Sequence, residues 1–63
     1  RNEEAVKILK EALAIDDKYA EAYRLMGIAQ VQMKQKAAAC ESFAKAKELG
    51  DPNVDALIEK NCK

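Results

Sequence analysis

The sequence has no histidine and no threonine, and Ser42 is its single serine. A nucleophile needs a neighbouring base, and two thiolates alone do not close a zinc site. Cys40 therefore has no base that would activate it, and the pair Asp16 and Asp17 is better explained by helix capping than by catalysis. We expect no catalytic residues, no metal and no cofactor, so the chain is not expected to be an enzyme.

Neither sign of charge is in excess, because 11 lysines and arginines balance 11 aspartates and glutamates. Proteins that bind nucleic acid or acidic lipid normally show a basic surplus. No apolar run approaches the roughly 18 residues of a membrane span, and no signal-peptide pattern is visible. We expect no nucleic acid and no membrane among the partners, and a cytoplasmic location. The opening on Arg1, almost inside a helical pattern, is interpreted as the start of a piece of a longer protein.

The chain is short, with 63 residues. A domain of this size buries about 60% of its unfolded surface and is marginally stable by itself. Disulfides, metals, assembly or very good helix packing commonly compensate. Cys40 lies in the middle of a helical pattern and Cys62 one residue from the end, which does not favour a bridge. We expect two reduced thiols, one of them packed as a small apolar residue, with a disulfide as the alternative.

Apolar residues recur at helical spacing along the whole chain, and only two glycines and one proline interrupt them. The spacing predicts helices over 2–15, from about 18 or 19 onward, over 36–49 and over 52–62. Asn2 is a candidate cap for the first helix, and Gly50 a left-handed stop for the third. Asp51 and Pro52 resemble an N-cap followed by a first helical residue.

A 34-residue repeat is the main organising feature. Ala5, Leu9 and Ala12 stand 34 positions before Ala39, Phe43 and Ala46. Such a period in a helical sequence indicates stacked helix pairs. The repeat places a turn at 34–36, although these residues include no Gly, Pro, Asn or Asp. On propensity alone, residues 18–49 would form one helix.

This pattern resembles that of tetratricopeptide repeat (TPR) proteins. The matching positions are Tyr23, Met26, Gly27, Ala39, Phe43, Ala46 and Pro52. The resemblance implies an all-α fold of antiparallel helix-turn-helix pairs, a solenoid fragment of four helices. Residues 1–15 would be the second helix of a preceding repeat, 20–53 a complete repeat, and 52–62 a capping or next-repeat helix. Gln30 departs from the family, which prefers an aromatic residue there, as does Asp17, where it prefers proline.

The physical reason for the signature is close helix packing. Gly27 and Ala39 are small enough for two antiparallel helices to approach each other, and Tyr23 and Phe43 fill the space beside them. We therefore expect Gly27→Leu to disrupt the packing.

The resemblance implies a function in protein–protein interaction, within a larger scaffold or co-chaperone-like protein. The partner would be a peptide or helix bound in a shallow groove. The groove positions implied by the family are Glu21, Arg24, Leu25, Ile28, Val31 and Gln32. Leu25 and Ile28 stand where carboxylate-clamp members have asparagine, so no clamp is expected. In the alternative, the apolar groove residues only pack against neighbouring helices.

Two further hypotheses remain open. A chain with an unpaired first helix would expose an apolar repeat face, which favours homo-oligomers. In the other hypothesis, the chain is an isolated helical bundle that binds no ligand.

Overall fold

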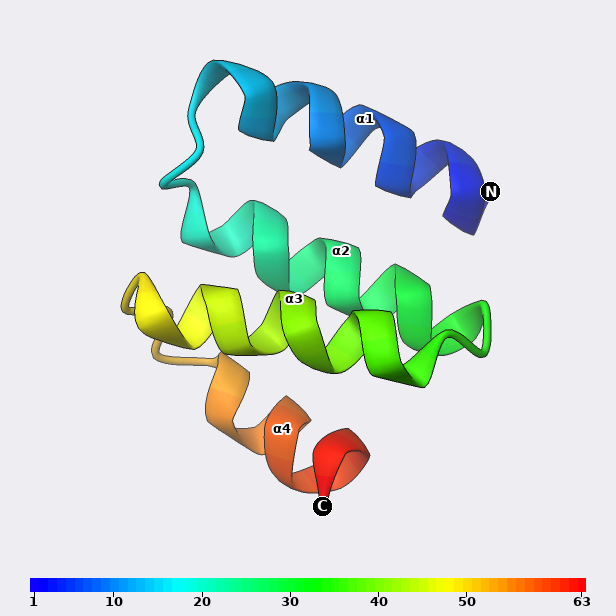
Figure 1. Ribbon diagram of the computed structural model, residues 1–63, viewed down its shortest axis with the longest axis vertical. Coiled ribbons are helices and arrows are strands. Elements are labelled where there is room, and N and C mark those ends of the chain that lie inside the picture. The colour runs from blue at the N-terminus through cyan, green and yellow to red at the C-terminus, as the bar shows by residue number, and fades with distance from the viewer.

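The computed structural model describes all residues from Arg1 to Lys63 and contains four helices and no strands. The helices are α1 (Asn2–Ile15), α2 (Ala20–Gln32), α3 (Lys36–Glu48) and α4 (Val54–Cys62). Each helix packs against the next one in the chain, and neighbouring helices run in opposite directions (Figure 1). The all-α architecture expected from the sequence is thus observed. No helix combines the length and the apolar character required to cross a bilayer.

The helix ends differ from the prediction at three places. Tyr19, and neither Asp16 nor Asp17, occupies the N-cap of α2. Asn2 lies inside α1, and Arg1 occupies the N-cap position without a capping side-chain bond. Asn53, not Asp51, precedes α4, and Pro52 lies in the turn before it. Asp51 Oδ1 still accepts the Asn53 N–H two residues on, as a capping carboxylate does, but α4 begins only at Val54. The predicted cap role of Asn2 is therefore wrong, and Asp51 does not occupy the N-cap position of α4 that the sequence predicted.

The turns after α2 and α3 have the same backbone structure. Lys34 has a φ of 63°, and Gly50 has a φ of 95°. After α2, the Gln35 N–H donates to the Gln30 carbonyl at 2.9 Å, and the bonds after α3 follow the same order. This is the left-handed helix stop that glycine normally provides. The turn that the repeat placed near residues 34–36 is present, with a lysine in the position that favours glycine.

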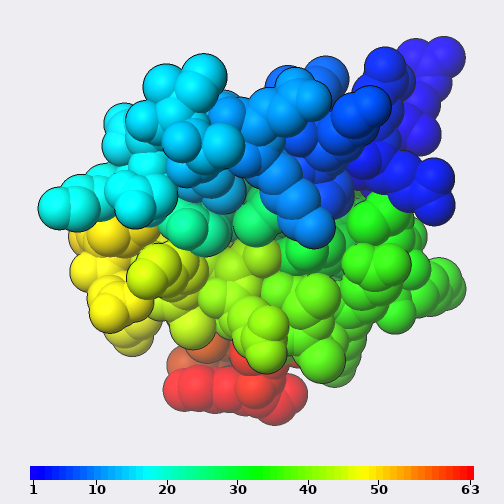
Figure 2. All heavy atoms as spheres, turned by 45° about the horizontal axis from the view of Figure 1, so that its top comes forward, coloured from blue at the N-terminus to red at the C-terminus, as the bar shows by residue number.

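The main core lies between α2, α3 and α4. It is built around four residues without solvent exposure: Ala39, Phe43, Ala46 and Val54. A Cβ atom on Gly27 would lie 2.6 Å from Cδ1 of the Phe43 ring, so the backbone of α2 approaches α3 over this glycine. A smaller cluster of Val6, Met26 and Ala29 holds α1 against α2. Figure 2 shows α1 as a separate layer above the α2 and α3 region.

The two cysteines form a disulfide between α3 and α4. The Cα atoms of Cys40 and Cys62 are 5.8 Å apart, and no free cysteine remains. The expectation of two reduced thiols is therefore wrong. Both cysteines are eleven positions from Asp51 in the turn, so the antiparallel course of α3 and α4 brings them together.

Candidate partner-binding surfaces

The six groove residues predicted from the sequence all belong to α2, but the structure distributes them over three surroundings. Glu21 and Arg24 lie near the turn between α3 and α4, beside Asp51. Leu25 faces a hollow shared with α1. Val31 and Gln32 face another hollow, shared with α4. A single continuous groove through all six is not formed.

Arg24 is occupied by an intramolecular ion pair. Its Nε donates to Asp51 Oδ2 at 2.7 Å, and its Nη2 lies 3.7 Å from Glu21 Oε2. The Asn53 N–H donates to Asp51 Oδ1 at 2.8 Å, and the Asp51 side chain is only 4% exposed. Together these contacts fix the turn after α3 against α2. The charge of Arg24 is therefore paired with carboxylates of the chain itself.

The environment of Asp51 also changes its pKa. Burial by itself would raise the pKa of the carboxyl group. The hydrogen bonds from Asn53 and Arg24, together with the Arg24 charge, outweigh burial and hold the pKa below its ordinary value of 3.8. Asp51 is thus a charged structural anchor at neutral pH.

The hollow between α1 and α2, here called the α1–α2 hollow, is more apolar than the hollow between α2 and α4. It has a volume of about 440 Å³. Six of its seven lining residues are hydrophobic, namely Ala5, Ile8, Leu9, Leu25, Ile28 and Ala29, and the seventh is Asn2. Ile8 is 57% exposed and Leu25 39% exposed. Two large aliphatic side chains at one site indicate a surface suited to another apolar surface.

The hollow between α2 and α4, here called the α2–α4 hollow, is smaller and has a polar rim. It has a volume of about 190 Å³. Its lining consists of Ile28, Val31, Gln32, Phe43, Leu57, Lys60 and Asn61. Lys60 is exposed, and none of the ion pairs in the structure includes it. The lining of this hollow therefore combines apolar side chains with a lysine that makes no ion pair.

Ile28 lines both hollows, so they adjoin along α2. Ile28 and Val31 also pack against the buried core around Phe43. The alternative was that these residues only pack against neighbouring helices. Both do support the core, but both also border a hollow. Leu25 differs, because it is 39% exposed and faces the α1–α2 hollow.

Gln30 has a partner that the sequence did not reveal. The Ser42 hydroxyl donates to Gln30 Oε1 at 2.7 Å, and both residues are buried. A buried amide requires such a partner. The family prefers an aromatic residue at position 30. The glutamine that stands there instead is hydrogen-bonded by a serine of α3, twelve positions later in the chain.

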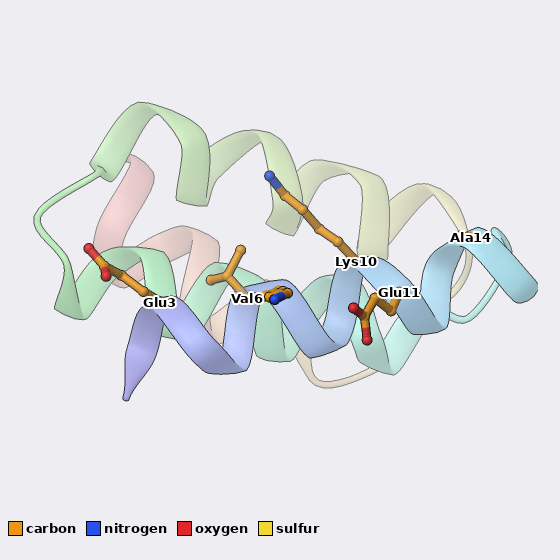
Figure 3. A pocket seen from close by; sticks show the side chains of 6 residues that line it. Glu3, Val6, Lys10, Glu11 and Ala14 are labelled. Atoms are coloured by element: carbon orange, nitrogen blue, oxygen red, sulfur yellow. The ribbon is translucent and has the colours of Figure 1, made fainter.

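A third hollow, of about 480 Å³, lies along α1 alone (Figure 3). It is lined by Glu3, Val6, Lys7, Lys10, Glu11 and Ala14. Two carboxylates and two ammonium groups balance each other on this face. With opposite charges interspersed and no second element forming a wall, the surface selects neither sign of ligand. No group of three or more potential metal-ligating side chains is found in the structure.

Comparison with known proteins gives one match. A family model described as a TPR repeat matches residues 1–34, which is more than half of the chain. The matched segment covers α1, α2 and the turn up to Lys34. No curated protein and no solved structure matches.

Proposed function

The chain belongs to the tetratricopeptide repeat family, and on this premise we propose that it binds a partner peptide in the α2–α4 hollow. Repeats of this family are generally protein–protein interaction modules and are typically not catalytic. We further propose that residues 1–15 end one repeat, 20–53 form a complete repeat, and 52–62 begin or cap the next. The module would be part of a larger scaffold or co-chaperone-like protein.

The composition of the α2–α4 hollow carries this proposal. Ile28, Val31 and Leu57 supply apolar surface, and Lys60 supplies a positive charge. Because Arg24 is engaged with Asp51, the charge that a ligand meets comes from α4 instead. The favoured ligand is an extended peptide with an aliphatic side chain next to an acidic residue. An apolar pocket with one placed charge gives both affinity and orientation.

A titration with synthetic peptides tests this proposal. Acetylated octapeptides with a central leucine would carry glutamate, glutamine or lysine on both sides, and amide chemical shifts of the protein would be followed. We expect the glutamate peptide to bind most tightly, with shifts on α2 and α4. Lys60→Gln should remove the preference for glutamate, while Lys7→Gln on α1 should keep it. Equal binding of all three peptides, or no binding, would contradict the proposal.

No carboxylate clamp is proposed. A peptide ending in Glu-Glu-Val-Asp should show no micromolar binding, because Arg24 is already paired inside the fold. Micromolar binding of this peptide would show that a clamp exists.

Self-association through the α1–α2 hollow is the second candidate function. The observation that favours it is the exposure of Ile8 and Leu25 beside a hollow with an almost entirely apolar lining. Light scattering over a concentration series would then show dimers or larger species. Ile8→Glu should give a monomer, whereas Ile15→Glu should not, because Ile15 is 89% exposed but lies outside the hollow. A monomer at all concentrations would reject this candidate.

A further inference from the structure

We propose that the Cys40–Cys62 disulfide is a reversible redox control on the α2–α4 hollow. The bridge holds the last turn of α4 on α3, and its reduction releases that turn and weakens peptide binding. This inference rests on the proposed function, because it assigns regulation to the same hollow.

The two halves of α4 are attached to the molecule in different ways. In the first half, Val54 is 0% exposed, and Leu57 and Ile58 pack against the main core. An ion pair between Lys47 and Asp55, at 3.2 Å, adds a link from α3 to the first turn. The first half of α4 is therefore held by the core, independently of the bridge.

In the last turn of α4, only Cys62, itself part of the bridge, packs against the main core. Asn61 Nδ2 donates to the Leu57 carbonyl at 3.0 Å, and Lys63 pairs with Glu59 at 2.9 Å, so both interactions stay within the C-terminal segment. The contacts that reach α3 run through the bridge, which joins Cys62 to Cys40 and places the Cys40 sulfur 3.7 Å from the Asn61 carbonyl. Helix ends fray readily where tertiary contacts are few.

This weakly attached turn provides one wall of the α2–α4 hollow. Of the three α4 residues that line the hollow, Lys60 and Asn61 come after Ile58, in the part that depends on the bridge. Leu57 belongs to the part that the core holds. Reduction should therefore leave the apolar floor intact and displace the ammonium group that selects an acidic ligand.

The chemistry needs two equivalents of a low-molecular-weight thiol. The first, as thiolate, attacks one sulfur of the bridge, forms a mixed disulfide and releases the other cysteine as thiolate. The second thiolate attacks the mixed disulfide, releases the remaining cysteine, and leaves as the oxidised reagent disulfide. The protein gains two protons and two electrons. A small disulfide oxidant reverses the same steps. Cys40 and Cys62 are both half-buried rather than enclosed, so the bridge borders solvent.

Amide hydrogen exchange tests the structural part of the inference. Exchange of the Lys60, Asn61 and Cys62 amides would be compared in the oxidised protein and in tris(2-carboxyethyl)phosphine. We expect at least tenfold faster exchange of these amides after reduction, and in the reduced protein they should exchange faster than the amides of α2 and α3, which stay protected. A Cys40→Ala/Cys62→Ala variant should show the fast exchange without reductant. If that variant does not fold, the reduced wild-type chain gives the same comparison. Unchanged exchange in the last turn would overturn the inference.

Peptide titration tests the functional part. The glutamate-flanked leucine octapeptide should bind at least threefold more weakly to the reduced protein, and oxidised glutathione, added after the phosphine has been removed, should restore the original affinity. Equal affinity in both states, with clear binding, overturns the redox control but leaves the binding function standing. Absence of binding in both states rejects the proposed function and with it this inference. The two failures are therefore distinguishable.

Discussion

At the scale of single residues, the contact between Gly27 and Phe43 sets the distance between α2 and α3. Alanine normally favours a helix over glycine by about 1 kcal/mol. Here the added methyl group would overlap a ring that is fully buried. We expect Gly27→Ala to lower the free energy of unfolding by about 1–3 kcal/mol. Urea denaturation followed by circular dichroism measures this change.

A double-mutant cycle provides the control for this clash. Phe43→Leu removes Cε1 and Cζ, two of the three ring atoms nearest to the added methyl group. In the Phe43→Leu background, Gly27→Ala should lower the free energy of unfolding by less than it does in the wild-type chain. Additive effects of the two substitutions would show that the ring is not the source of the penalty.

The Arg24–Asp51 pair makes stability depend on pH. The folded-state pKa of Asp51 is below the ordinary value of 3.8, so the charged pair stabilises the fold above that value. This contribution is lost as the pH falls through the folded-state pKa. We expect Asp51→Asn, which keeps an acceptor for the Asn53 N–H, to destabilise the chain at pH 7 and progressively less below pH 3.8. Urea denaturation at several pH values measures the difference.

Asp55→Asn is the matched control, because the pair between Asp55 and Lys47 is exposed and screened by solvent. Its effect on the free energy of unfolding should be small at every pH. An effect of Asp51→Asn that stays constant from pH 7 to pH 3 would contradict the assigned role of the pair.

At the scale of elements, the helices could be predicted from apolar spacing, and their ends only in part. The stop at Gly50 follows from local chemistry, since glycine adopts a positive φ without strain. The stop at Lys34 has the same geometry but no local signal, and only the 34-residue repeat indicated it. The ion pair between Asp51 and Arg24 could not be predicted from local sequence, because the two residues lie 27 positions apart in the chain.

The turn at Lys34 leads to a prediction. A side chain at positive φ carries a cost of about 1–2 kcal/mol that glycine avoids. We expect Lys34→Gly to raise the free energy of unfolding by about 1 kcal/mol, after allowing for the greater freedom of glycine in the unfolded chain. Thermal denaturation measures it. Lys45→Gly, in the helical part of α3, should instead lower stability by about 1 kcal/mol. A loss in both variants would show that Lys34 is not strained.

At the scale of the whole molecule, the candidate site was predicted less well than the fold. The family pattern put all six expected groove residues on α2. The structure pairs Arg24 with Asp51, and the hollow proposed for the ligand also includes Leu57 and Lys60 on α4, which the pattern did not indicate. The disulfide was missed because the cysteines were judged by their places along the chain. Their equal separation from the turn at Asp51 was the available signal, since an antiparallel helix pair aligns such positions.

The bridge bears on the stability of the whole chain because the molecule is small. With 63 residues, the free energy of unfolding is expected to be about 3–9 kcal/mol. A bridge between residues 22 positions apart contributes about 3 kcal/mol in the chain-entropy account. We expect the urea midpoint to fall clearly on reduction, and the Cys40→Ala/Cys62→Ala variant to match the reduced chain with or without reductant. Equal midpoints for oxidised and reduced protein would mean that helix packing alone stabilises these four helices.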